Sequence, residues 1–182
     1  MKLSAIFVHK RSAAILLSLV ILAVIALFLL LYLVYVPKKY SAYVSKYAVE
    51  YGLEEEFVYA VIRAESNFRA DAISTAGARG VMQLMPSTAQ FIAECIGEEL
   101  KIDSPQDNIR MGVWYLSYLK DRFGGQTETL AAYNAGEGTV RLWLKDERYS
   151  SDGETLQNIP ISETKLYVRR VKKFYNSYKF CY

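Results

Sequence analysis

One acidic side chain lies in an otherwise apolar helical stripe. The residues that share this face of a predicted helix are Phe57, Val58, Val61, Ile62 and Glu65. A glutamate is rarely buried without a partner, and burial raises the pKa of a carboxyl group toward neutrality. Glu65 is therefore a candidate proton donor at neutral pH. The stretch alone leaves open that Glu65 reaches water at the edge of the stripe, or pairs with Arg63 or Arg69.

The scarcity of histidine narrows the chemistry. His9 is the only histidine, and it precedes a long apolar run. The chain beyond that run therefore cannot build a histidine-based zinc site, a Ser-His triad or a Cys-His dyad. We expect no metal and no organic cofactor. The two cysteines, Cys95 and Cys181, lie far apart in sequence. Either they pair, or Cys95 is a free buried thiol, which is the simpler interpretation.

The apolar run at residues 13–36 carries no charge and is long enough to cross a bilayer. It predicts a single transmembrane anchor in the lipid bilayer, preceded by a short cytoplasmic tail at residues 1–12. A cleavable signal peptide is the competing interpretation, but residues 32–37 offer no small-residue cleavage site. The remaining chain, residues 40–182, is the candidate catalytic domain.

The charge balance argues against a nucleic-acid partner. Residues 1–39 hold five of the 22 basic residues and none of the 19 acidic residues. The remainder is therefore slightly acidic, and the positive charge belongs to the membrane flanks.

Helical periodicity and turn residues predict a mainly α domain of six or seven helices. The expected helices cover residues 40–51, 54–66, 86–95, 108–123, 127–135, 140–144 and 162–178. Asp107 or Asn108 is predicted to cap the helix that ends at Phe123. Residues 67–79 are expected to form a loop, residues 80–86 an irregular or strand-like segment, and residues 145–158 a surface loop.

Four motifs remain to be explained together. They are Glu65-Ser66, Gly80-Val-Met-Gln-Leu-Met-Pro86, Ala132-Tyr-Asn-Ala-Gly136 and Glu163-Thr-Lys-Leu-Tyr-Val168. In this order and at these separations, they resemble lytic transglycosylases of the soluble type, whose fold is similar to goose-type lysozyme. The resemblance implies cleavage of peptidoglycan glycan strands between N-acetylmuramic acid and N-acetylglucosamine, leaving 1,6-anhydro ends. It also implies a bacterial cytoplasmic membrane protein, with the catalytic domain outside the cytoplasm.

The resemblance implies two catalytic residues, Glu65 as the acid and Tyr167 as a hydroxyl that approaches it. Five further residues are candidates for substrate binding, namely Ser66, Met82, Gln83, Tyr133 and Asn134. For each of these a structural role is the alternative: helix termination for Ser66, an exposed loop position for Gln83, helix capping for Asn134, and core packing for Met82, Tyr133 and also Tyr167.

Two other functions stay open from sequence. A hydrolytic muramidase on the same fold needs a base to activate water, and Asp71 or Glu137 would have to supply it. A membrane-anchored module that binds glycan without turnover is the second, although it has no need of an acid in an apolar stripe. Glu163 is a candidate second carboxylate, but it also suits the positive end of a helix dipole.

Overall fold

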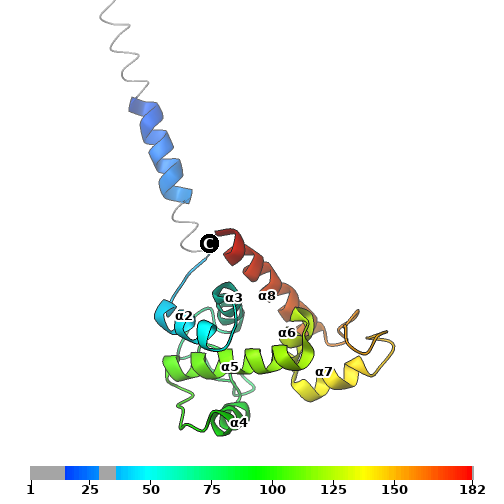
Figure 1. The fold of residues 1–182 in the computed structure, drawn as a ribbon. Helices are drawn as coiled ribbons and strands as arrows, with labels where there is room; N and C mark the ends of the chain where they lie inside the picture. The colour runs from blue at the N-terminus through cyan, green and yellow to red at the C-terminus, as the bar shows by residue number, and fades with distance from the viewer. Residues whose placement is uncertain (1–14, 29–35, 182) are drawn as a thin grey trace, which may run out of the picture. The chain divides into compact units, whose positions relative to one another are not determined.

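The computed structural model describes residues 15–28 and 36–181, and the chain divides into two units, Met1–Pro37 and Lys38–Tyr182. Residues 15–28 form a helix (Figure 1). The side chains of this helix are exposed. Within the described residues, no helix has both the length and the apolar character needed to cross a bilayer. The rest of the predicted span, residues 13–14 and 29–35, lies outside the described residues, as does the predicted tail at residues 1–12.

The second unit is mainly helical, as the periodicity predicts. Its described residues form seven helices (Figure 1). These are α2 (Ser41–Glu50), α3 (Glu55–Glu65), α4 (Pro86–Ile96), α5 (Pro105–Phe123), α6 (Gln126–Ala135), α7 (Glu137–Leu144) and α8 (Ser162–Cys181).

The helix that carries the candidate acid lies in the core. Every residue from Phe57 to Ile62 of α3 is buried, so the apolar face extends around most of this helix. α3 packs along α8, where the rings of Tyr59 and Tyr178 stack with their centroids 5.4 Å apart. At the start of α3, Glu54 accepts hydrogen bonds from Tyr175 and Lys179 of α8, both at 2.8 Å. The two helices are thus joined along their length.

Helix α5 connects the two sides of the domain, since it packs against α2, α4 and α6 (Figure 1). The prediction that Asp107 or Asn108 caps this helix is wrong. Ser104 is the N-cap and its Oγ accepts a 3.4 Å hydrogen bond from the backbone N–H of Asp107, while Pro105 occupies the first helical position. The helix begins one turn early because proline at that position needs no hydrogen-bond donor. Asn108 is therefore fully buried within the helix.

The segment between α3 and α4 has little regular structure, in agreement with the sequence. Isolated antiparallel bridges join Ile73 to Arg79 and Arg79 to Leu84. We refer to residues 79–84 as the amide loop, because it presents Gln83. Val81 and Met82 of this loop are fully buried, whereas Gln83 has a φ of 49°, which is unusual for a residue with a side chain.

Two other expectations need correction. Cys95 is a free thiol and does not pair with Cys181, but it is exposed on α4, not buried. Its position on the solvent side of a short surface helix explains this. Helix α7 begins at Glu137, three residues earlier than predicted, because Gly136 ends α6 with a φ of 92° and lets the next helix start at once.

Candidate active site

Glu65 is the last residue of α3 and is half-buried. Burial raises the pKa of its carboxyl group from 4.5 to about 7, and Tyr167 and the Arg170 guanidinium oppose that rise only in part. Its place at the carboxyl end of a helix also disfavours a negative charge. Glu65 can therefore hold a proton at neutral pH and still release it, which the apolar stripe predicts.

Tyr167 lies on α8 and is 2% exposed. Its hydroxyl is close enough to Glu65 to lower the pKa of that carboxyl group, yet among the described residues it forms no hydrogen bond of ordinary length. A buried hydroxyl without a partner is unfavourable by about 1–3 kcal/mol. The hydroxyl is thus available to a carboxylate or a ligand that moves slightly toward it.

Tyr133 of α6 connects the acid to a cavity. Its hydroxyl donates a 2.9 Å hydrogen bond to the backbone carbonyl of Met82. Burial raises the pKa of the Tyr133 hydroxyl well above 10, and the nearby Glu65 carboxylate raises it further. Tyr133 also lines a cavity of about 250 Å³. Glu65 is not among the residues that line this cavity, but its charge acts on Tyr133, which does line it.

Polar and aromatic groups line this cavity. Its walls are Gln83, Leu84, Met85, Thr88, Tyr115, Tyr133, Asn134, Ala135 and Gly136. A second cavity of about 330 Å³ shares two of these residues, Thr88 and Tyr115. It adds Ser87, Phe91, Tyr118 and Glu137. Sugar rings pack on aromatic faces while amides bind their hydroxyl and N-acetyl groups. The two adjoining cavities therefore suit a carbohydrate chain.

The amide of Gln83 is held firmly at this cavity. Its Nε2 donates hydrogen bonds to the backbone carbonyls of Ala72 (3.0 Å) and Gly80 (2.9 Å). No described residue donates to its Oε1, so this oxygen is free to accept a hydrogen bond from a ligand. The exposed-loop alternative for Gln83 does not fit these contacts.

Asn134 is exposed at the cavity wall, and no described residue binds its amide. The C-terminal hydrogen bond of α6 comes from Gly136, whose N–H donates to the carbonyl of Ala132 at 2.9 Å. Asn134 is therefore not needed to close the helix, and its amide is free to bind a ligand.

Ser66 and Met82 are close to the site but are occupied by contacts within the protein. Ser66 is 3% exposed, and its hydroxyl donates a 2.7 Å hydrogen bond to the carbonyl of Val81. The side chain of Met82 is fully buried against Gly112 of α5. These contacts favour the structural alternatives for both residues, with Ser66 joining the end of α3 to the amide loop.

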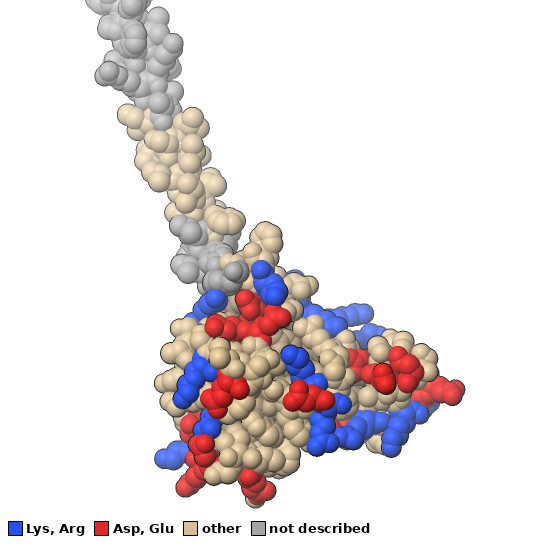
Figure 2. All heavy atoms as spheres, in the orientation of Figure 1, with Lys and Arg blue, Asp and Glu red and all other residues tan. Residues whose placement is uncertain are grey.

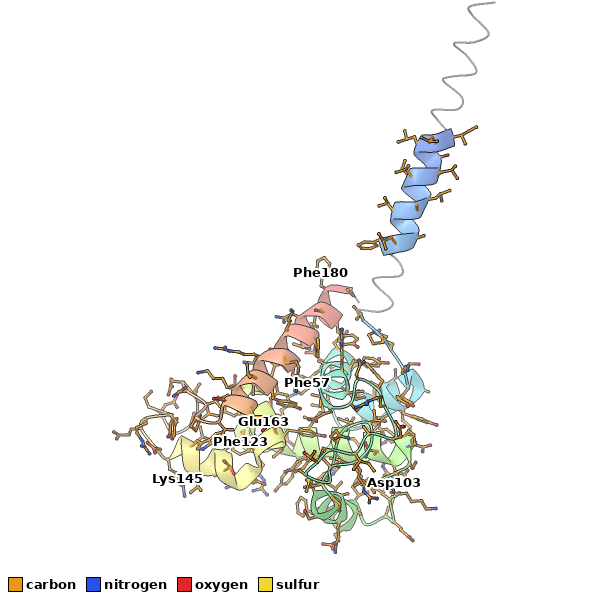
Figure 3. The ribbon with its side chains drawn as sticks, turned by 180° about the vertical axis from the view of Figure 1, so that it is seen from behind. Phe57, Asp103, Phe123, Lys145, Glu163 and Phe180 are labelled. Atoms are coloured by element: carbon orange, nitrogen blue, oxygen red, sulfur yellow. The ribbon has the colours of Figure 1, made fainter. Side chains whose placement is uncertain are left out.

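The other candidate carboxylates lie elsewhere. Asp71 is exposed, and Glu163 is exposed in the first turn of α8 (Figure 3). Glu137 accepts hydrogen bonds from Tyr118 (3.1 Å) and from Arg141 Nε (3.0 Å). None of the three, nor any other described carboxyl group, contributes to the pKa of Glu65.

Sequence reasoning missed two buried polar residues near these elements, Asn108 and Glu128. The sequence indicates only a helix-capping role for Asn108. Glu128 lies in the first turn of α6, where acidic residues are common. Its Oε1 accepts a 2.8 Å hydrogen bond from the N–H of Leu156. No motif marks either residue, because their partners are backbone groups far away in sequence.

Comparison with known proteins shows the family to which this chain belongs. The family model described as Transglycosylase SLT domain matches residues 42–156, and the chain belongs to this family. It is 32% identical over 151 residues to the soluble lytic murein transglycosylase of Escherichia coli K12, which covers 79% of this chain and 23% of that protein. It is 30% identical over 168 residues to membrane-bound lytic murein transglycosylase C of Mannheimia succiniciproducens, covering 78% and 47%.

Solved structures agree with the fold. An inactive mutant of the lytic transglycosylase Slt from Pseudomonas aeruginosa, in which a glutamate is replaced by glutamine, superposes with a TM-score of 0.69 at 39% identity, covering 79% of this chain and 24% of that one. The 70-kDa soluble lytic transglycosylase of Escherichia coli gives 0.72 at 30% identity, covering 80% and 25%. The chain thus spans about a quarter of the length of these relatives, and the helical lytic-transglycosylase fold is confirmed.

Proposed function

We propose that this protein is a peptidoglycan lytic transglycosylase, which cleaves the β-1,4 bond between N-acetylmuramic acid and N-acetylglucosamine and leaves 1,6-anhydro ends. The observation that carries the proposal is the half-buried Glu65 beside Tyr133 and Tyr167, in a domain of the SLT family. The relatives are named as murein transglycosylases, and one is inactive when a glutamate becomes glutamine, which supports a single essential acid.

One carboxyl group is sufficient for this reaction. Protonated Glu65 gives its proton to the glycosidic oxygen, and the bond from that oxygen to C1 of the muramic acid breaks. The N-acetyl oxygen of the same sugar stabilises the positive charge at C1. Glu65, now a carboxylate, removes the proton of the C6 hydroxyl, whose oxygen bonds to C1 and closes the anhydro ring. An attacking group within the same sugar has a high effective concentration, so it competes well with water.

Tyr167 supports the second half of this cycle. Its unpartnered hydroxyl can donate to the Glu65 carboxylate once the proton has left. Such a bond favours the charged form, and the effect of Tyr167 on the pKa of Glu65 has the matching direction. Gln83 and Asn134 are placed to bind N-acetyl or hydroxyl groups of the strand from the cavity wall.

A hydrolytic muramidase is less well supported. It needs a base near Glu65, yet Asp71 is exposed and Glu137 is bound to Arg141 and Tyr118. A binding module without turnover has no use for a carboxyl group whose pKa lies near 7. The single-acid mechanism requires neither additional group.

Mass spectrometry of the fragments released from purified peptidoglycan tests the proposal. The full chain in detergent should release muropeptides with anhydro ends, and Glu65→Gln should still bind glycan but release almost none. Reducing ends in place of anhydro ends would identify a muramidase. An absence of fragments with wild-type protein that still binds glycan would identify a binding module.

We also propose that residues 13–36 anchor the protein in the cytoplasmic membrane, with the catalytic domain outside the cytoplasm. The uncharged run, the exposed apolar helix at residues 15–28 and a membrane-bound relative support this. The charges on the domain fit a water-exposed body, since acidic and basic side chains lie intermingled on the face shown in Figure 2. Carbonate-resistant sedimentation with membranes, together with protease sensitivity in spheroplasts, tests it. Release by carbonate, or protection of the domain, contradicts it.

A further inference from the structure

Asn108 of α5 is a fully buried polar residue outside the site described above. Its Oδ1 accepts a 2.8 Å hydrogen bond from the N–H of Met82. Its Nδ2 donates to the carbonyls of Arg79 (3.0 Å) and Ile102 (2.9 Å). All three hydrogen bonds go to the backbone, and two of them hold the amide loop. No ligand is required to satisfy this side chain, so its role concerns the loop.

The packing around Asn108 leaves no spare volume. A Cβ at Gly80 would lie 2.4 Å from the Asn108 Nδ2, and a Cβ at Gly112 would lie 2.4 Å from the Met82 Sδ. Asn108 and Gly112 are four residues apart, so they lie on the same face of α5. This face therefore contacts the amide loop through a hydrogen-bonding group and through a site where only glycine fits.

The amide loop passes this constraint to two residues of the candidate site. Met82, held through its N–H by Asn108, accepts the hydrogen bond of Tyr133 through its carbonyl. Gln83 follows directly with a φ of 49° and donates to the carbonyl of Gly80. A residue at positive φ persists only where its surroundings determine its conformation. Asn108 helps to fix the conformation of Gln83, because it binds the backbone of Arg79 and Met82 in the same loop.

We propose that Asn108 is a positioning residue that fixes Gln83 and Tyr133 in the geometry that binds the glycan strand during turnover. This inference rests on the proposed function. Asn108 does not contact the cavity, and it acts through the backbone of residues 79–83. A displacement of about 1 Å in such a group can cost about 10²-fold in rate.

Asn108→Asp tests the proposal in the full chain. Aspartate keeps the acceptor for Met82 but replaces the donor to Arg79 and Ile102. We expect turnover on soluble glycan strands to fall about 10²-fold at a temperature where circular dichroism shows the variant folded. Asn176→Asp makes the same chemical change at an exposed position of α8 and should leave turnover within about 2-fold, in line with ordinary surface substitutions.

A double-mutant cycle separates positioning from general destabilisation. If Asn108 acts through Gln83 and Tyr133, then Asn108→Asp should cost less than about 3-fold in a background that carries both Gln83→Ala and Tyr133→Phe, because the two groups being positioned are already gone. An equal loss in both backgrounds, or wild-type turnover in Asn108→Asp, overturns the inference.

Hydrogen exchange on the wild-type protein needs no variant to fold. The Met82 amide should exchange as slowly as the amides of α5, and exchange at the rate of an exposed loop overturns the proposal. The proposed function fails if the wild-type protein releases no anhydro fragments. This inference fails if an active wild type shows fast exchange at Met82 or an equal loss in both backgrounds of the cycle.

Discussion

Two glutamates in this domain, Glu65 and Glu128, have opposite surroundings. Glu65 ends α3 and receives no backbone hydrogen bond from any described residue, and burial raises its pKa to about 7. Glu128 is 3% exposed in the first turn of α6, accepts a hydrogen bond from the N–H of Leu156 and folds back over Gly125. A helix start stabilises a carboxylate, whereas a helix end does not. Both glutamates are shielded from water, and they differ in that a backbone N–H binds Glu128.

The largest expected difference between the two glutamates is in turnover. Glu65→Gln removes the proton donor and should lower the rate by at least about 10²–10⁴-fold. Glu128→Gln keeps an oxygen that accepts the hydrogen bond from the Leu156 N–H. Because this bond is retained, the rate should stay within about 3-fold of wild type. Release of anhydro muropeptides measures both. Equal losses would mean that Glu128 takes part in the chemistry.

Tyr167→Phe sharpens the account of Glu65 with an intermediate effect. Removal of the hydroxyl leaves the carboxylate without a donor in the ring-closing step, so the rate should fall by about 10-fold or more. The pKa of Glu65 should also rise, because Tyr167 lowers it in the wild type. The proposed mechanism requires protonated Glu65, so the alkaline limb of kcat/KM, expected near pH 7 in the wild type, should move to higher pH. A limb that stays in place or moves to lower pH contradicts this arrangement.

The smallest expected effect is on stability. The folded protein binds the Glu65 proton more tightly than the unfolded chain does, so ionisation of Glu65 costs stability as the pH rises from about 4.5 to 7. Glu65→Gln should therefore stabilise the protein at pH 8, by at most about 3 kcal/mol, and should change little at pH 4.

Glu128→Ala provides the contrasting change. It leaves the buried Leu156 N–H unpaired and should destabilise by about 1–3 kcal/mol at pH 8. Urea unfolding at both pH values measures the two variants. Shifts in the same direction at pH 8 would remove the distinction between the two glutamates.

The sequence predicts most of the helical fold, because periodic apolar residues and glycines mark helix faces and ends locally. The stripe of α3 and the glycine after α6 are examples. The start of α5 was mispredicted, since Asp, Asn and Ser are all acceptable caps and sequence alone does not rank them. The exposure of Cys95 depends on which side of α4 faces α5, which a short helix with a mixed surface leaves undetermined.

The sequence motifs indicate the residues of the candidate site, but they do not indicate the buried residues that hold the surrounding backbone in place. Tyr133 lies near Glu65 and lines the same cavity as Gln83. Asn108 and Glu128 were missed because each binds backbone atoms of a distant segment. Every residue has the same backbone groups, so the sequence does not indicate which of them a side chain will bind. The catalytic roles of Glu65 and Tyr167 stay predictions until turnover is measured.

The short bond from the Ser66 hydroxyl to the Val81 carbonyl has a bearing on inhibitors. This hydrogen bond joins Ser66, which follows Glu65, to the amide loop, which carries Gln83. Glu65 and Gln83 are therefore held at a constant separation before an inhibitor binds. A rigid bicyclic molecule that spans both would lose little freedom on binding, and neither would the protein. Stiff scaffolds should therefore bind this site more tightly than flexible chains of equal contact area.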